Sequence, residues 1–244
     1  MQVRRVVRRI FHGAGFEVRR FLPEQSEWAG LCRMLRAHEV TAVLDVGAST
    51  GGFASHLFDA GFDGRVISFE PLTRSHSELL RAARGNARWI VAPPVALGSE
   101  QGTSTINISA NVGSSSLLPM LSAHLAAAPS SACVGKEMVQ VTTLDDVASD
   151  FIAGDDIVFI KIDVQGFESE VIKGARRTLA RAAGVHIELS FVPLYEGQSL
   201  FRDTWDHLSS LGFEPWAFSP AFTDNTSGRM LQMDGVFFRG VGEA

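Results

Sequence analysis

Cysteine is scarce in this sequence of 244 residues. Cys32 and Cys133 are its two cysteines, and they lie far apart with no C-x-x-C spacing. This excludes a disulfide framework, argues against a zinc ribbon, and fits a reducing compartment. Apolar runs of membrane-spanning length are also missing, and the first residues lack the features of a signal peptide. We therefore expect a cytoplasmic protein.

An excess of positive charge is missing as well. The formal net charge is -5, so the chain as a whole is not a polycation and we expect no nucleic-acid partner. Hydrophobic residues at 45% and charged residues at 20% are ordinary for a globular protein. The length accommodates one large α/β domain with a substantial core and makes two domains unexpected.

A glycine-rich turn follows the first apolar run, residues 42–44. The dinucleotide pattern G-x-G-x-x-G is missing, and Asp45 stands just before the first glycine, where it would repel a pyrophosphate. An acid there suits a ligand with a positive end, such as the methionine ammonium of S-adenosylmethionine. Asp45-x-Gly47-x-x-x-Gly51 resembles the first motif of class I methyltransferases. The alternative is an ordinary strand–helix turn in which Ser49 or Thr50 caps the helix.

Acids close several of the predicted strands. Strand 65–69 ends at Glu70-Pro71, where a carboxylate can accept both ribose hydroxyls of an adenosine, although a solvent-facing strand end is the alternative. Strand 88–91 is followed by an apolar turn, 95–98, that suits an adenine pocket. Strand 156–163 ends in an acid, and strand 185–189 ends near one. We expect helices over 53–58, 75–84, 171–181 and 200–211, with strands 213–218 and 236–238 closing the sheet.

Two regions depart from this alternation. Residues 99–143 read as an insertion or lid with strands 103–108 and 138–142, a helix over 121–128 and a serine-rich loop at 113–116. Residues 1–40 read as a helical extension before the main domain at 41–244, with Ser26 capping a helix over 27–38. Residues 1–20 carry six arginines and apolar residues at helical spacing. They form either a packed helix or a surface for anionic lipid or a charged substrate.

Short motifs are spread over residues 41–219. They are Asp45-Val46-Gly47-Ala48 with Gly51, Phe69-Glu70-Pro71, Ala96-Leu97-Gly98, Gly113-Ser114-Ser115-Ser116, Thr143-Leu144-Asp145, Lys161-Ile162-Asp163-Val164-Gln165-Gly166-Phe167-Glu168, Val171-x-Lys173-Gly174, Glu188-Leu189 and Pro193-Leu194-Tyr195. Together they resemble the FkbM family of S-adenosylmethionine-dependent methyltransferases, and the run 161–168 is the most specific of them. Pro93-Pro94 is a departure, because members often carry a polar residue there.

The resemblance implies a class I methyltransferase fold, a Rossmann-like three-layer α/β sandwich. Its sheet would have seven mostly parallel strands in the order 3-2-1-4-5-7-6, with strand seven antiparallel. The resemblance also implies O-methylation, and we expect a sugar, oligosaccharide or glycolipid acceptor and allow for a homodimer. We expect the cofactor to contact Asp45, Gly47, Ser49, Gly51, Glu70, Pro71, Ala96, Leu97 and Asp163. We expect the acceptor to contact Ser114, Ser115 and Tyr195.

Methyl transfer to a hydroxyl needs alignment and a base. Asp163 is the first candidate base and Glu188 the second. His186 has a suitable ordinary pKa, but a lone histidine inside a strand is more often packed core. Neighbouring carboxylates raise each other's pKa, and the relieving partner is the cationic end of the cofactor, Lys161 or His186, or a magnesium ion on Asp163 and Glu188.

Two other functions remain open from the sequence. An oxidoreductase of the NAD-binding type is one, and the missing G-x-G-x-x-G and the presence of Asp45 count against it. A non-catalytic module that binds the cofactor is the other, and the full set of strand-end acids argues against it.

Overall fold

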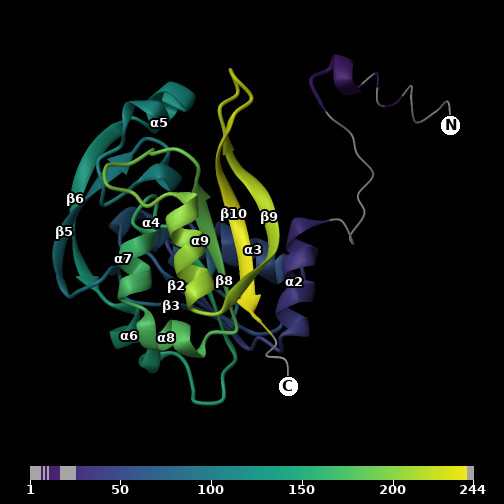
Figure 1. Ribbon diagram of the computed structural model, residues 1–244, viewed down its shortest axis with the longest axis vertical. Helices are drawn as coiled ribbons and strands as arrows, with labels where there is room; N and C mark the ends of the chain where they lie inside the picture. The colour runs from purple at the N-terminus through teal and green to yellow at the C-terminus, as the bar shows by residue number, and fades with distance from the viewer. Residues whose placement is uncertain (1–6, 8, 10, 17–25, 241–244) are drawn as a thin grey trace.

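A seven-stranded sheet forms the centre of the protein (Figure 1). The computed structural model describes residues 7, 9, 11–16 and 26–240. The strand order is β3-β2-β1-β7-β8-β10-β9, and β10 is antiparallel to both of its neighbours, which confirms the predicted order and orientation. The strands are β1 (Ala42–Val46), β2 (Arg65–Phe69), β3 (Trp89–Val91), β7 (Val158–Ile162), β8 (Gly184–Ser190), β9 (Phe213–Thr223) and β10 (Met230–Arg239).

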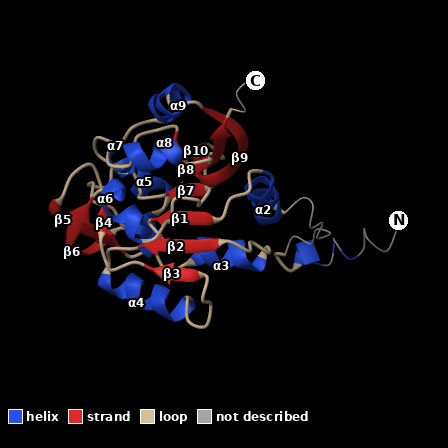
Figure 2. Cartoon of the chain, turned by 90° about the horizontal axis from the view of Figure 1, so that it is seen from below, coloured by secondary structure: helices blue, strands red, loops and turns tan. Residues whose placement is uncertain are grey.

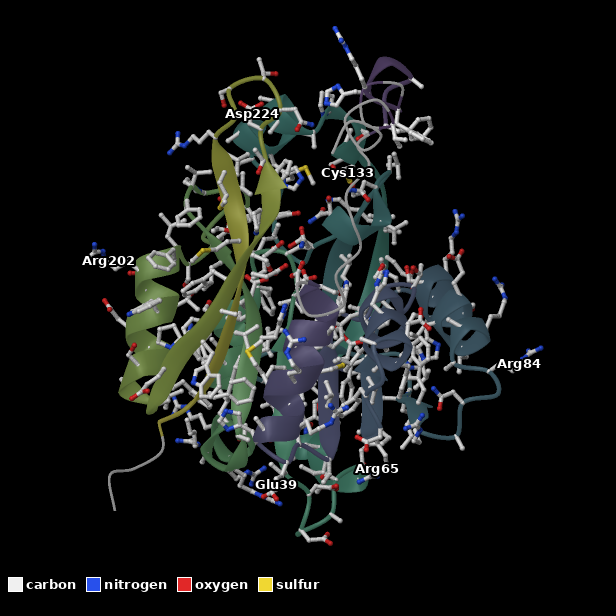
Figure 3. The ribbon with its side chains drawn as sticks, turned by 90° about the vertical axis from the view of Figure 1, so that its right-hand side faces the viewer. Glu39, Arg65, Arg84, Cys133, Arg202 and Asp224 are labelled. Atoms are coloured by element: carbon white, nitrogen blue, oxygen red, sulfur yellow. The ribbon has the colours of Figure 1, made fainter. Side chains whose placement is uncertain are left out.

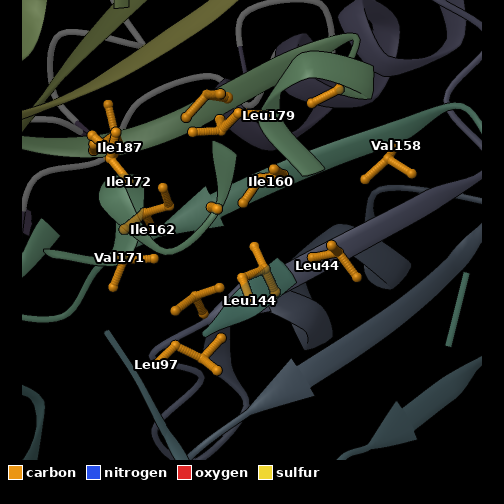
Figure 4. Close-up of a cluster of buried hydrophobic side chains, with 14 of the residues drawn as sticks. Leu44, Leu97, Leu144, Val158, Ile160, Ile162, Val171, Ile172, Leu179 and Ile187 are labelled. Atoms are coloured by element: carbon orange, nitrogen blue, oxygen red, sulfur yellow. The ribbon is translucent and has the colours of Figure 1, made fainter. Parts of the chain in front are cut away.

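Helices cover both faces of the sheet, as Figure 2 shows. Leu35, Leu57 and Leu79 bring α2, α3 and α4 onto one face, in a cluster that includes Val43 and Phe159. The other face packs under α6, α7, α8 and α9, and part of its aliphatic core is drawn in Figure 4. Burying each such side chain contributes about 1.5–3 kcal/mol. The helices are α2 (Glu27–Ala37), α3 (Gly52–Asp59), α4 (Thr73–Ala82), α6 (Leu144–Val147), α7 (Glu168–Lys173), α8 (Arg176–Arg181) and α9 (Phe201–Ser210).

Of two predictions about helices, the Ser26 cap is confirmed and the single helix over 171–181 is not. Ser26 caps α2, and its side chain accepts a hydrogen bond from the backbone nitrogen of Ala29 at 3.5 Å, as predicted. The single helix predicted over 171–181 is wrong, because the chain breaks into α7 and α8 at Gly174. Gly174 lies so close to the next layer that an added Cβ would be 1.9 Å from the carbonyl oxygen of Gly98. Packing of this backbone against Gly98 therefore accompanies the bend.

The last two strands are longer than predicted. Strands over 213–218 and 236–238 become β9 and β10, which pair over most of their length. Gln232 and Asp234 interrupt the apolar pattern of β10, although both lie within the sheet. Asp224, in the turn between these strands, and Glu39, just before β1, lie at opposite ends of the molecule (Figure 3). The parallel strands therefore run from the Glu39 end toward the Asp224 end.

Residues 96–142 build a second, three-stranded sheet beside the first (Figure 1). Its order is β4-β6-β5, so the predicted apolar turn at 95–98 contains a short strand that joins the insertion to the core. These strands are β4 (Ala96–Leu97), β5 (Gly102–Ser109) and β6 (Cys133–Thr142), with α5 (Ser122–Ala127) and the 3-10 turns Val112–Ser114 and Pro129–Ser131; a further 3-10 turn, Ala148–Asp150, follows α6.

The basic helix predicted at the N-terminus lies largely outside the described residues. Among the helices that the structure describes, none is long and apolar enough to cross a membrane.

Candidate functional site

The carboxyl ends of β1, β2 and β7 border a cavity, which we call the Glu70 cavity. The insertion supplies one wall through Ile106, Val112 and the loop at 113–117. Among the residues predicted to bind cofactor or acceptor, the cavity is lined by Gly47, Ser49, Glu70, Pro71, Ala96, Leu97, Asp163 and Ser115.

Gly47 sets the floor of this cavity. Its φ is +77°, and an added Cβ would lie 1.9 Å from the carbonyl oxygen of Asp163. The loops after β1 and β7 can approach this closely only because the position is glycine. Ser49 is also left-handed, with a φ of 49°, and this directs its N–H toward Glu70.

Glu70 is held by the backbone on both oxygens. Oε2 accepts from the nitrogen of Ser49 and Oε1 from the nitrogen of Leu72, each at 2.9 Å. Burial raises the pKa of Glu70 to about 7, although these two N–H bonds lower it. Each carboxylate oxygen has a second lone pair. Glu70 can therefore still accept the two hydroxyls of a ribose.

An apolar slot continues from Glu70 toward the insertion. It is formed by Leu72, Val95, Leu97, Ile106 and Phe167. Asp163 lines the same cavity, and its side chain is 37% exposed. A carboxylate for a diol, an apolar slot for a flat ring and a second carboxylate for a cation are the groups that S-adenosylmethionine requires. The residues present fit this cofactor.

Asp45 is fully buried and does not line the Glu70 cavity, and its predicted contact with the cofactor stays a prediction. Its Oδ1 lies 3.3 Å from Nζ of Lys161, and its Oδ2 accepts from Oγ of Ser68 at 3.0 Å. Lys161 also lies 3.6 Å from Oδ2 of Asp163 and donates to the carbonyl of Gly47 at 2.8 Å. Burial would lower the pKa of Lys161, but Asp45 and Asp163 raise it overall. Lys161 is therefore one relieving partner that the sequence suggested.

Gly51 likewise lies behind the cavity wall. Its φ is +92°, and an added Cβ would be 2.7 Å from the ring of Trp89. Gly51 therefore allows close packing between the start of α3 and β3.

Three carboxylates extend from the cavity across neighbouring strands: Asp163 directly follows β7, Glu188 lies in β8 and Asp234 lies in β10. We call them the acid row. Nε2 of Gln165 joins the first two, donating to Oδ1 of Asp163 at 2.8 Å and to Oε2 of Glu188 at 3.1 Å. Nε2 of Gln232 donates to the same Oε2 at 2.6 Å. Burial, and then the negative charge of Asp163, holds the pKa of Glu188 well above its usual range.

His186 lies one step deeper in the sheet, opposite Lys161. It is buried, its ring is 5.5 Å from that of Phe53, and its Nδ1 has no hydrogen-bond partner within the described chain. Burial, together with the charge of Lys161, lowers the pKa of His186 to about 4. At neutral pH this imidazole is uncharged and a weak base.

The hydroxyls predicted to bind the acceptor have partners inside the protein. The hydroxyl of Tyr195 is fully buried, 3.0 Å from the carbonyl of Ser114 and 2.9 Å from Oε1 of Gln165. Oγ of Ser115 accepts from the nitrogen of Ser109 at 3.0 Å. Ser114 and Tyr195 border a second cavity of about 540 Å³ rather than the first. Their part in acceptor binding stays a prediction.

The magnesium hypothesis finds no support. Across the described ranges, no group of three or more His, Cys, Asp or Glu side chains is placed to hold a metal ion. Nitrogen atoms of Gln165 and Lys161 contact the two carboxylates that were predicted to bind it. Gln165, Gln232 and Asp234 are the residues of this site that sequence reasoning missed.

The family model described as the Methyltransferase FkbM domain matches residues 45–215. The chain belongs to the FkbM methyltransferase family. A 2-O-methyltransferase, NoeI of Sinorhizobium fredii, is 42% identical to it over 77 residues, which are 31% of each chain. This FkbM chain thus matches less than a third of that relative's length.

Solved structures show the same fold. A Klebsiella pneumoniae protein described as an O-methyltransferase superposes with a TM-score of 0.50 at 10% identity, over 96% of this chain and 88% of that one. Magnesium protoporphyrin IX methyltransferase of Synechocystis, with bound S-adenosylmethionine, gives 0.48 at 13% identity over 96% of each chain. The FkbM chain has a class I methyltransferase fold. Its family match over residues 45–215 replaces the oxidoreductase alternative.

Proposed function

We propose that this FkbM methyltransferase transfers a methyl group to a hydroxyl of a sugar, oligosaccharide or glycolipid acceptor. The observation that carries the proposal is the place of Asp163. Its side chain lines the Glu70 cavity and also belongs to the acid row, through Gln165. It stands where the cofactor side of the site meets the side left for an acceptor.

S-adenosylmethionine, when bound, supplies an electrophilic methyl group on a sulfonium centre. The protein's part is to bind and orient. Glu70 receives the ribose hydroxyls while the N–H groups of Ser49 and Leu72 fix its carboxylate. Lys161 is held by Asp45 and, by contacting Gly47 and Asp163, keeps the two loops together.

Asp163 is the proposed base that takes the hydroxyl proton. It is partly open, and contacts from Lys161 and Gln165 fix its orientation. Burial, and then the charge of Asp163, raise the pKa of Glu188 well above its usual range, and two amides already bind its Oε2, so Glu188 stays the second candidate. His186, with a pKa lowered to about 4, is too weak a base for this role. A general base contributes about 100- to 10,000-fold to such a step.

The class of acceptor is argued from the acid row and from the relative. Clustered carboxylates repel an anionic group and accept hydrogen bonds from neutral hydroxyls. NoeI carries the name 2-O-methyltransferase, which supports oxygen as the atom methylated. Cytoplasmic location, a homodimer and contact of the N-terminus with anionic membrane stay predictions.

The test is a methyl-transfer screen with radiolabelled S-adenosylmethionine. The full chain is incubated with neutral methyl glycosides, oligosaccharides and a glycolipid, with and without EDTA. We expect label in an ether that survives mild alkali, unlike a methyl ester, and no effect of EDTA. Binding of S-adenosylhomocysteine without transfer to any hydroxyl would instead indicate a non-catalytic module.

A further inference from the structure

Asp234 lies on β10 directly opposite Glu188 of β8. Its other strand neighbour is Ser219 of β9, whose hydroxyl donates to Glu27 at the start of α2. Asp234 therefore faces a space bounded by β8, β9 and α2, at the far end of the acid row from the Glu70 cavity.

Asp234 differs from the other buried carboxylates in its partners. Glu70 and Glu168 each accept two backbone N–H groups, and Glu188 accepts two side-chain amides. Asp234 is half-buried, and it makes no hydrogen bond or ion pair with any residue that the structure describes. Its oxygens are not among the fully buried side-chain atoms that lack a partner, so a ligand can reach them.

The charges around Asp234 limit that ligand. Burial, and then Asp163 and Glu27, raise its pKa to about 7 against the opposing effect of Lys161. Glu188 is the cross-strand neighbour, and Lys161 is already shared between Asp45 and Asp163. The surroundings are net acidic, which disfavours a phosphate or carboxylate and leaves hydroxyl donors as the fitting partners.

Glu188 has room for the same kind of contact. Both amides that bind it, those of Gln165 and Gln232, donate to Oε2, and no described residue donates to Oε1. Opposite residues of antiparallel strands have Cβ atoms about 4.5–5.5 Å apart. Two carboxylates at that spacing can receive two hydroxyls carried by adjacent carbons of one ring.

We propose that Asp234 binds the acceptor, receiving a hydroxyl next to the one that is methylated, and that with Glu188 it selects acceptors with vicinal hydroxyl groups. The proposal rests on the proposed function, because it requires a hydroxylated acceptor at this edge. It assigns Asp163 to the reacting hydroxyl and Asp234 to its neighbour.

The experiment uses the methyl glycosides that the wild-type protein methylates, together with analogues lacking one hydroxyl beside the methylated position. Asp234→Asn keeps the size of the side chain and removes the charge. We expect its KM to rise about tenfold to a hundredfold, the loss of a hydrogen bond to a charged group, with kcat within threefold and S-adenosylhomocysteine binding unchanged. Asp206→Asn, on exposed α9 across the sheet, is the matched control and should behave as wild type.

The deoxy analogues test the same contact without altering the protein. With one analogue, the wild-type KM should rise by a similar factor, and Asp234→Asn should then add no further loss. An unchanged KM in Asp234→Asn, equal additional loss on every analogue, or no deoxy analogue with a raised KM would each overturn the inference. Failure of the wild-type protein to methylate any glycoside would remove the proposed function, and this inference with it, before Asp234 is tested.

Discussion

Glu70 differs from two carboxylates of the acid row, Glu188 and Asp234, in what holds it. Backbone N–H groups hold both oxygens of Glu70. In the acid row, side-chain amides of Gln165 and Gln232 hold Glu188, and no described residue holds Asp234. A backbone donor survives any substitution of its side chain except proline, whereas a side-chain donor does not. The proposed cofactor half of the site, the Glu70 cavity, is therefore fixed by the path of the chain. The proposed acceptor half, the acid row, can change by substitution.

The largest effect is expected from Gly47→Ala, which disturbs the chain path of the cofactor half. The new Cβ would overlap the carbonyl of Asp163 and would also sit in a left-handed conformation. We expect a loss of about 3 kcal/mol or more in the free energy of unfolding, together with loss of S-adenosylhomocysteine binding.

Gly61→Ala is the matched control for that change. Its φ is +90°, but nothing lies within 4 Å of the added Cβ. It should cost only about 1–2 kcal/mol of backbone strain and leave cofactor binding intact. Denaturant unfolding and calorimetric titration measure both variants, and equal losses would show that contact with Asp163 is unimportant.

Asp163 belongs to both the Glu70 cavity and the acid row, so Asp163→Asn tests whether catalysis can be lost without loss of cofactor affinity. The amide keeps the shape but cannot take a proton, so turnover should fall by roughly 100-fold or more while the Kd for S-adenosylhomocysteine changes little. Asp155→Asn, on an exposed loop, should leave both quantities unchanged. Near-normal turnover in Asp163→Asn would move the base to another member of the acid row, and Glu188→Gln would be the next variant.

Glu70→Ala probes the cofactor half alone. It removes an acceptor of two ribose hydroxyls, and the affinity for S-adenosylhomocysteine should fall by about 1.5–3 kcal/mol. Glu100→Ala, which removes an exposed carboxylate outside the Glu70 cavity, serves as the control in the same titration. A folded Glu70→Ala protein with wild-type affinity would place the ribose elsewhere.

The smallest effect is a pH dependence at Glu168, which lies under the turn joining the two halves. Burial raises its pKa to about 7, above its ordinary value near 4.5, so the folded state binds more protons between these values. Its contribution to stability is full below about pH 4.5 and is lost as pH rises through about 7. The stability of wild type relative to Glu168→Gln should therefore fall by about 1–3 kcal/mol from pH 5 to pH 8.

Urea unfolding of the cofactor-free proteins across that range gives the measurement. Glu196→Gln changes an exposed carboxylate and should run parallel to wild type. A constant difference between wild type and Glu168→Gln would mean that Glu168 is ionised throughout.

The sequence was enough to predict residues of the Glu70 cavity, because each of them is identified by its own position beside a strand end. Glu70 directly ends β2, and Gly47 directly follows β1, so strand ends alone predict both. The sequence did not show that Asp45 would be buried against Lys161, because Lys161 lies on another strand and meets Asp45 only through the pairing of β1 with β7.

The acceptor half depends on such long-range pairing throughout. Asp234 becomes a neighbour of Glu188 only when β10 enters the sheet beside β8. Polar residues inside β10 interrupt the hydrophobic pattern by which strands are predicted. The sequence analysis therefore predicted neither the full length of β10 nor a role for Asp234. Gln165 stood within a recognised motif, but nothing local showed that its amide would join two carboxylates.

The position of β10 also sets an order of events during synthesis. Within the described chain, β9 is made before β10 yet pairs with no other strand of the sheet. Until residues 230–239 leave the ribosome, β8 is an open edge and β9 has nowhere to attach. At about 5–20 residues per second this exposure is brief, and it ends when one strand inserts between two that are already present. The same insertion carries Asp234 to Glu188, so an unfinished chain has an unprotected sheet edge and an incomplete acid row together.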